Sequence, residues 1–394
     1  MGKYNFDEMI DRINDPYSYS MKWMDSPFMA AMNGVDHLPE DRISLVTADM
    51  DFKVAPAIIE AMHKVAEHGI YGYSSTTKEY NEAVCHWFKT RQNWEFKPED
   101  ITYLPGTHTA VAECVKRLTK PGEGVIVLTP SYSYHGDVDA IGRTYVPVEM
   151  FNNNGYYTIN FEALEEACAN ENNTMFIICH PHNPSGRVFN EEELLKMAEI
   201  SRKHNVIMVT DEVHGDITRA GVTFHPMMKV VGPQGIIALT AVNKTFNLAG
   251  LAMTNMIICD PELKEKYGRY FNLPSPFGVA AVIAAYTQGA DWVDELNEYL
   301  DENLNYVINF IKEKMPRAKC YMPEGGYIIW IDFSGYGLTD EEIKDRVFNK
   351  AHLILQGGSN FDSGTGQQWQ RACLPSPKAM IVEAFDRLYK AFEE

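Results

Sequence analysis

A lysine and an aspartate in the middle of the chain have the surroundings of reacting groups. Lys244 comes soon after the apolar run IIALT, with Asn243 before it. A lysine that is partly buried beside another cation has a lowered pKa and becomes a competent amine nucleophile. Asp211 directly follows the apolar run VIMVT, where a poorly hydrated carboxylate requires a cationic partner. Taken singly, a solvated lysine and a helix-capping aspartate are the simpler interpretations.

The spacing of these two residues places them at the ends of neighbouring strands. Asp211 and Lys244 are 33 residues apart (244 − 211), which is enough for one helix and one further strand. Tyr132 and Asn183 follow two other predicted strands in the same way. Open α/β sheets bind their ligands at the carboxyl ends of the strands. We therefore expect these side chains to meet at one site.

A glycine at the start of a helical pattern predicts a phosphate-binding turn. Gly106 follows a short apolar run, and Thr107 and His108 open the next helical pattern. The free N–H groups of a helix N-terminus bind phosphate well. Asn183 can donate a hydrogen bond to a ligand ring and Tyr132 can stack on it. A Pro-Gly turn and a core aromatic residue are the structural alternatives for these last two.

Alternating strand and helix patterns predict an α/β fold. Near-continuous apolar runs separated by helical patterns imply a large domain with a mostly parallel mixed sheet flanked by helices. After a long helical pattern at Asp291–Lys314, the order of strands and helices predicts a smaller α+β domain. We expect an N-terminal segment over 1–47 that packs on the small domain or a partner subunit, a large ligand-binding domain over 48–288 and a small domain over 289–394. The candidate strands of the large domain are Gly124–Thr129, Thr174–His180, Val206–Thr210, Ile236–Thr240 and Thr254–Cys259.

The composition argues against several kinds of partner. The net charge of −19 opposes binding to nucleic acid and to anionic lipid. The seven cysteines are scattered and form no C-x-x-C pair, so neither a disulfide framework nor a metal site is predicted. Neither a secretory signal nor an apolar run of membrane-spanning length is apparent. We expect a cytoplasmic protein with no nucleic-acid, membrane or metal partner.

Longer motifs around the same residues resemble one group of enzymes. The sequence ADMDF at 48–52, the sequence HNPSG at 182–186 and the sequence KTFNLAGL at 244–251 carry the resemblance. Together they resemble the fold type I, aspartate-aminotransferase-like enzymes that use pyridoxal 5′-phosphate (PLP). More narrowly they resemble the MalY/PatB group of cystathionine β-lyase-like C–S lyases. The resemblance extends from Phe6 to the C-terminus and implies the PLP-dependent transferase fold.

The resemblance assigns roles around the cofactor ring. It implies that Lys244 carries PLP as a Schiff base and moves protons, and that Asp211 pairs with the ring nitrogen. Tyr132 would stack on the ring. Asn183 and His214 would lie near the phenolic oxygen, with His214 where many aminotransferases have tyrosine.

Around the cofactor phosphate the chain departs from the pattern of that group. Gly106 is followed by Thr107 and His108 instead of small apolar residues, and Asn243 stands in place of a serine. We expect Thr107 to offer its hydroxyl to the phosphate and His108 to face either the phosphate or the substrate. The resemblance also implies that Tyr73 reaches the cofactor phosphate of a neighbouring subunit, which makes a homodimer with shared active sites.

The resemblance also implies the substrate contacts and the reaction. Arg371, which on its own would be an ordinary surface arginine, matches the residue that binds the α-carboxylate of an amino-acid substrate. Asp49, Asp51 and Tyr71 are candidates for the entrance, with a purely structural role for the ADMDF turn as the alternative. The implied reaction is β-elimination from cystathionine or another cysteine S-conjugate to pyruvate, ammonia and a thiol.

Three other functions are considered beside this reaction. An aminotransferase acting on an L-amino acid is the principal alternative, because the same lysine serves both reactions. A regulatory binding role is a second alternative, although no residue points to it. A nucleotide-binding protein is disfavoured, since neither a G-x-G-x-x-G after the first strand nor a G-x-x-x-x-G-K-[ST] motif is present.

Overall fold

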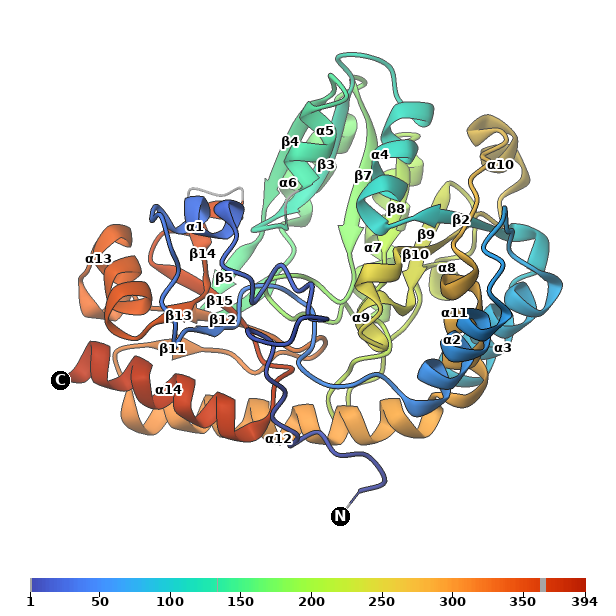
Figure 1. Ribbon diagram of the computed structural model, residues 1–394. Coiled ribbons are helices and arrows are strands. Elements are labelled where there is room, and N and C mark those ends of the chain that lie inside the picture. The colour runs from blue at the N-terminus through green and yellow to red at the C-terminus, as the bar shows by residue number, and fades with distance from the viewer. Residues whose placement is uncertain (1, 133, 362–365) are drawn as a thin grey trace.

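A seven-stranded sheet forms the centre of the larger part of the molecule (Figure 1). The computed structural model describes residues 2–132, 134–361 and 366–394. Strand β10 runs antiparallel to both of its neighbours, and the other adjacent pairs are parallel. The mostly parallel mixed sheet predicted from the sequence is confirmed. In spatial order the strands are β2 (Ile101–Pro105), β10 (Met253–Ile257), β9 (Ile236–Ala241), β8 (Ile207–Asp211), β7 (Asn173–Cys179), β3 (Gly124–Thr129) and β4 (Thr144–Glu149).

Alternate side chains of the central strands fill two apolar layers. In β3, Val125 and Val127 face one layer, while Ile126 and Leu128 face the other. Because helices cover both faces, successive residues of a strand are all buried, which explains the near-continuous apolar runs. The helices of the first layer are α4 (Thr107–Leu118), α5 (Tyr134–Asp139) and α10 (Pro261–Tyr267). The second layer includes α3 (Lys78–Gln92), α6 (Phe161–Ala169), α7 (Glu191–Lys203), α8 (Met227–Val231) and α11 (Pro276–Gln288).

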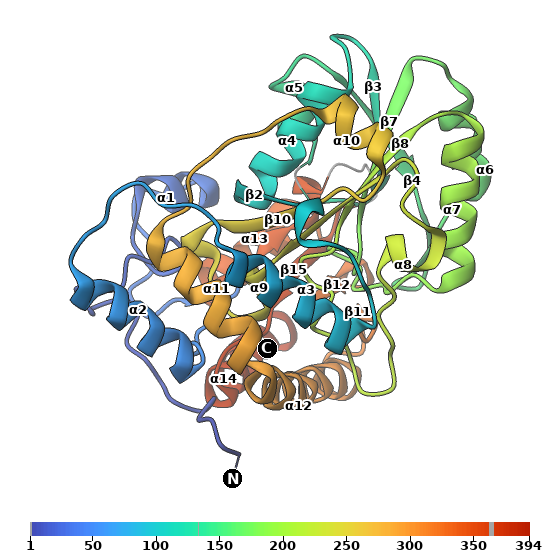
Figure 2. The same cartoon turned by 90° about the vertical axis from the view of Figure 1, so that its right-hand side faces the viewer.

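Local signals place the element boundaries close to their predicted positions. The five candidate strands start and end within two residues of the observed ones. Helix α7 begins after Asn190, whose side chain accepts a hydrogen bond from the Glu193 backbone N–H, and Glu193 returns the contact. Such a capping box satisfies two N–H groups that the helix itself leaves free. Helices α2 (Pro56–His68), α3 and α11 pack together at the outer side of this part of the molecule (Figure 2).

A second, antiparallel sheet and its helices form a smaller apolar core. The sheet has the order β11-β12-β15-β14. The long helix α12 (Ala290–Lys314) belongs to both cores, because Leu296 packs in the larger one and Val307 in the smaller. It runs below both sheets, beside the C-terminal helix α14 (Figure 1). The remaining elements here are β11 (Lys319–Cys320), β12 (Ile328–Asp332), α13 (Asp340–Lys344), β14 (Gln356–Gly357), β15 (Trp369–Cys373) and α14 (Lys378–Glu393).

The N-terminal segment joins the two cores and faces the centre of the molecule. Residues 2–26 contain no helix or strand, and they precede α1 (Pro27–Asn33) and β1 (Ile43–Ser44). Strand β1 pairs in parallel with β13 (Leu353–Ile354), and Trp23 packs in the smaller core. A hairpin of β5 (Phe151–Asn153) and β6 (Tyr156–Thr158) lies outside the main sheet. Among the described residues, no helix has both the length and the apolar character needed to cross a bilayer.

Candidate active site

A cavity of about 900 Å³ lies at the carboxyl ends of the parallel strands. The last residues of β7 and β8 line it, as do the turns that follow β2, β3 and β9. This is the edge of the sheet where the polar segments were expected to meet. Of the residues singled out from the sequence, the cavity brings together Asp49, Gly106, Thr107, His108, Tyr132, Asn183, Asp211, His214, Asn243, Lys244 and Arg371.

Lys244 enters the cavity from a single helical turn, α9 (Val242–Thr245), that follows β9. Its Nζ donates a hydrogen bond to the Ala48 carbonyl oxygen at 3.1 Å. Burial lowers the pKa of the Lys244 amine, and the nearby Arg371 acts in the same direction. A lowered pKa increases the fraction of uncharged amine at neutral pH, so Lys244 has the character of a nucleophile and a general base.

Asp211 is a buried carboxylate at the end of β8. Burial raises its pKa, and hydrogen bonds from Tyr134 and from the Val213 backbone N–H oppose that rise. The Tyr134 hydroxyl donates to Oδ2 at 2.7 Å. Among the described residues no lysine, arginine or histidine forms an ion pair with Asp211, and the nearby charges of His108 and Lys244 add to the stabilisation by the two hydrogen-bond donors. Such a carboxylate suits a cationic ligand atom.

Tyr134 was missed in the sequence analysis. It lies only two residues after Tyr132 and begins α5, but its burial makes it resemble a core aromatic residue. The only sequence signal is its place in the polar segment after β3. A tyrosine that contacts a residue 77 positions away leaves no periodic pattern in the sequence.

Several buried polar atoms at the cavity have no partner. The Nδ1 atom of His214 and the Oδ1 atom of Asn243 form no hydrogen bond with any described residue. Burial lowers the pKa of His214 to about 3, so its ring is neutral near pH 7. The Asn183 carbonyl oxygen accepts from Arg371 at 3.2 Å, which leaves its amide group as a donor. An unpartnered buried polar atom costs about 1–3 kcal/mol, so these atoms indicate a polar ligand.

The first turn of α4 forms an anion-binding corner of the cavity. Gly106 precedes the helix with φ of +102°, a conformation that favours glycine. The Thr107 hydroxyl lies 3.2 Å from the Thr254 hydroxyl. His108 Nδ1 lies 2.6 Å from an oxygen of Asp137, and this hydrogen bond raises the pKa of His108. A helix N-terminus with a histidine of raised pKa favours a bound anion.

Arg371 is buried in the middle of β15 and is not a surface residue. Its Nη2 donates to the Val46 carbonyl oxygen at 2.7 Å. The guanidinium carbon lies 5.2 Å from the ring centroids of both Tyr132 and Phe361. Its Nε has no hydrogen-bond partner among the described residues. The guanidinium plane is therefore fixed by its neighbours while keeping a donor for a ligand.

Three expected site residues lie outside the cavity. The Tyr71 hydroxyl donates to the Ala66 carbonyl oxygen, and the Tyr73 side chain is 97% exposed. Asp51 does not line the entrance, contrary to the expectation, because Lys22, Trp23 and other donors surround its carboxylate. The structural alternative for the ADMDF turn is the better description of Asp51.

The N-terminal segment supplies a cavity wall whose residues were not singled out from the sequence. The wall residues are Arg12, Asp15, Tyr17, Ser18, Tyr19, Ser20, Met21 and Lys22, and the stretch 47–50 lies beside them. No sequence signal could have indicated which of its residues line the cavity, since the segment has neither helical nor strand periodicity.

The chain is similar in sequence to known proteins over most of its length. A model of the family "aminotransferase class I and II" matches residues 40–388. The chain belongs to this family. Cystathionine β-lyase PatB of Bacillus subtilis (strain 168) is 35% identical, with 98% of this chain and 99% of PatB aligned. Protein MalY of Escherichia coli (strain K12) is 29% identical over 83% of this chain and 86% of MalY.

A solved structure supports the same family assignment. Cystalysin of Treponema denticola, whose crystal structure contains a pyridoxal 5′-phosphate cofactor, superposes with a TM-score of 0.93. It is 31% identical and covers 99% of each chain. The resemblance to the MalY/PatB group is thereby confirmed.

Proposed function

We propose that this protein is a PLP-dependent C–S β-lyase that cleaves cystathionine or a related cysteine S-conjugate. The observation that carries the proposal is the meeting of Lys244 and Asp211 in one cavity. The first is an amine of lowered pKa, and the second is a buried carboxylate that forms no ion pair with any described residue. The relatives PatB, MalY and cystalysin support it.

The residues of the cavity fit the ring of PLP. Lys244 would hold the aldehyde carbon, and Asp211 would pair with the protonated ring nitrogen. Tyr132 would cover one face of the ring. His214 and Asn183 would lie near the phenolic oxygen, where the unpartnered Nδ1 and the free amide group can bind it.

The anion-binding corner fits the phosphate of the same cofactor. Gly106, Thr107 and His108 would hold it through backbone N–H groups, a hydroxyl and an imidazole of raised pKa. Asn243 is the fourth candidate for this group, because its buried Oδ1 is unpartnered among the described residues. When bound, PLP supplies an electron sink for the electron pair of a broken Cα–H bond.

The protein's own residues then perform the remaining tasks. Arg371 binds the α-carboxylate of the substrate and so orients its Cα–H bond. Lys244 acts as the general base that removes the Cα proton. The C–S bond breaks, the sulfur leaves with the bond's electron pair and takes up a proton as the free thiol. One water molecule is consumed as the carbon skeleton is released as pyruvate and ammonia.

A transamination is the alternative within the same family, because Lys244 can return the proton to a different carbon. The PatB and MalY relatives favour elimination. The two reactions differ in what they require: elimination needs no second substrate, whereas transamination needs a keto acid.

We also propose the quaternary and domain arrangement. Ile70, Tyr73 and Phe271 expose at least 70% of their surface, which favours burial against a second copy of the chain. Tyr73 would then reach the cofactor phosphate of the partner. The large domain would span 48–288 and the small domain 289–394, with α12 as the joint. The cytoplasmic location stays a prediction, which cell fractionation can check.

The proposed function is tested by spectroscopy and product analysis on the same sample. The purified protein supplied with PLP should show visible absorption that Lys244→Ala abolishes. Addition of L-cystathionine should release pyruvate without any keto acid. Bleaching by the amino acid without pyruvate, with recovery on adding a keto acid, would assign an aminotransferase. Failure to bind PLP at all would refute the proposed chemistry.

A further inference from the structure

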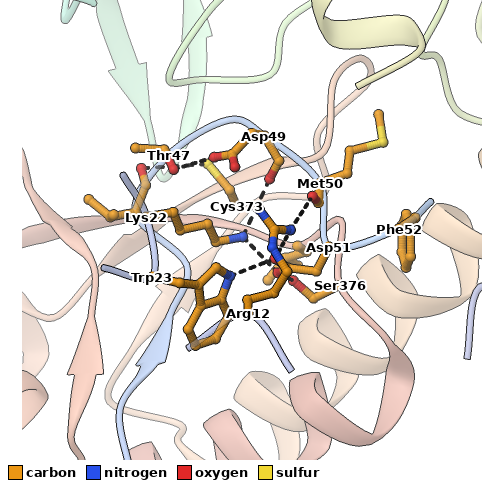
Figure 3. Close-up of polar contacts among 12 residues, drawn as sticks. Arg12, Lys22, Trp23, Thr47, Asp49, Met50, Asp51, Phe52, Cys373 and Ser376 are labelled. Carbon is orange, nitrogen blue, oxygen red and sulfur yellow. Dashed lines mark hydrogen bonds and ion pairs between the residues drawn. The ribbon is translucent and has the colours of Figure 1, made fainter. Parts of the chain in front are cut away.

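Asp51 is the centre of a buried polar cluster behind the cavity wall (Figure 3). Its Oδ1 accepts from Trp23 Nε1 at 2.7 Å and from Arg12 Nη1 at 3.2 Å. Its Oδ2 accepts from Lys22 Nζ at 2.8 Å and from the Ser376 hydroxyl at 2.7 Å. The Asp51 carboxylate is only 2% exposed, and the Lys22 side chain has no exposure at all. Each carboxylate oxygen of Asp51 thus accepts two hydrogen bonds.

Three of these four donors belong to the N-terminal segment. Between Arg12 and Lys22 that segment has neither helix nor strand, and it lines the cavity along its length. Its backbone contributes few internal hydrogen bonds, such as the one from Ser18 N–H to the Asp15 carbonyl oxygen. Its position therefore depends on its two ends, and both ends are held by Asp51.

The stretch that carries Asp51 also supports the reacting side chains. The Val46 carbonyl oxygen accepts from Arg371, and the Ala48 carbonyl oxygen accepts from Lys244. Asp51 itself is fixed by its backbone N–H, which donates to the Pro375 carbonyl oxygen at 2.9 Å. A side chain rigidly attached to the catalytic stretch thus holds the outer wall of the cavity.

We propose that Asp51 is a positioning residue that clamps residues 12–22 as the wall for the group carried on the substrate sulfur. It thereby determines which cysteine S-conjugates bind. This inference rests on the proposed function. Asp51 touches neither the cavity nor the substrate, so it acts through the segment that it holds.

The chemistry of the wall indicates an apolar or aromatic group on the sulfur. Tyr17 and Tyr19 are each 82% exposed and Met21 is about half exposed, so their apolar surface is available at the cavity. The two cations of the wall, Arg12 and Lys22, both contact the Asp51 carboxylate. Over its described residues, the wall then has no cation that lacks a carboxylate contact and could be devoted to a distal carboxylate. An S-benzyl group fits this wall better than the charged distal end of cystathionine.

The test compares a substrate that reaches the wall with one that does not. S-benzyl-L-cysteine carries a large apolar group, whereas β-chloro-L-alanine has only a chloride leaving group. In the holoenzyme, Asp51→Asn should raise KM for S-benzyl-L-cysteine about tenfold or more, equivalent to about 1.4 kcal/mol. Its kcat, and both constants for β-chloro-L-alanine, should change less than about twofold. Asp51→Glu should recover part of the loss.

A matched control comes from a neighbouring contact. Lys53 forms an exposed ion pair with Glu8, so it also joins the N-terminal segment to this stretch of chain. Lys53→Met should leave KM for both substrates unchanged. Arg12→Met is a second, milder variant, because the Lys22–Asp51 pair remains charge-balanced in it. It should raise KM for S-benzyl-L-cysteine selectively if Asp51→Asn does not fold.

Hydrogen exchange of the holoenzyme supplies a readout that is independent of turnover. Asp51→Asn should speed exchange in residues 12–24 about tenfold, while the central sheet stays protected and Lys53→Met has no effect. An equal loss of activity on both substrates, or unchanged exchange in this segment, would overturn the proposal. If the wild-type protein releases pyruvate from neither substrate, the proposed lyase function fails, and hydrogen exchange alone decides whether Asp51 holds the wall.

Discussion

Replacing Arg371 by lysine tests the substrate-binding geometry most directly. The guanidinium already donates through Nη1 to Asn183 and through Nη2 to the Val46 carbonyl oxygen, and its Nε is without a partner among the described residues. It therefore keeps donors for a two-point contact with a carboxylate. A lysine keeps the positive charge but cannot serve both neighbours and a carboxylate in a fork. The substitution thus removes the forked arrangement of donors and preserves the positive charge.

The expected loss follows from the hydrogen bonds involved. One of two charge-assisted hydrogen bonds to the carboxylate contributes about 1.5–3 kcal/mol, which corresponds to a roughly 10- to 150-fold weaker affinity. The assay measures inhibition constants for L-alanine and for ethylamine, which differ only by the carboxylate. Arg371→Lys should weaken inhibition by L-alanine by that factor and leave inhibition by ethylamine unchanged. Equal effects on the two amines, or unchanged inhibition by L-alanine, would refute the assignment of Arg371.

Two pH-dependent predictions follow from the titratable groups. The pKa of His108 is raised by its hydrogen bond to Asp137, so this ion pair stabilises the fold below the ordinary histidine pKa and is lost as pH rises through the raised value. Asp137→Asn should lower the melting temperature more at pH 6 than at pH 9. The loss of stability should be less than about 1 kcal/mol, because His108 is half exposed. Equal effects at both pH values would contradict this prediction. Burial raises the pKa of Glu212 to about 8, so the folded state binds a proton that the unfolded state releases, and stability falls between the ordinary carboxyl pKa and about 8. The melting temperature of Glu212→Gln relative to wild type should therefore increase from pH 5 to pH 8, and a constant difference would show that Glu212 is charged in the folded protein.

The apolar layers and the polar strand ends were predictable because local rules govern them. A strand buried on both faces must be apolar at successive positions, and a capped helix begins at a recognisable residue such as Asn190. Asp211 ends one such strand and Lys244 lies in the turn after the next one along the chain, so their meeting at one sheet edge follows from the topology. The role proposed for Arg371 came from the resemblance, since nothing in its local sequence indicates burial.

The contacts between distant segments could be known only from the tertiary structure. Tyr134 stabilises Asp211 across 77 residues, and Asp51 is surrounded by Lys22 and Trp23 from a segment without periodicity. The path of the chain back to the edge of the sheet decides whether a given carboxylate lines the cavity or lies behind its wall.

The sequence by itself therefore determined the α/β architecture, the edge of the sheet at which the cavity lies and the residues at its strand ends. The reason is that periodicity, caps and strand ends are set by neighbours in the chain. The tertiary structure decided the partner of Asp211, the buried place of Asp51 and the wall formed by residues 12–22. These depend on desolvation and on donors supplied from distant positions, neither of which a local pattern records.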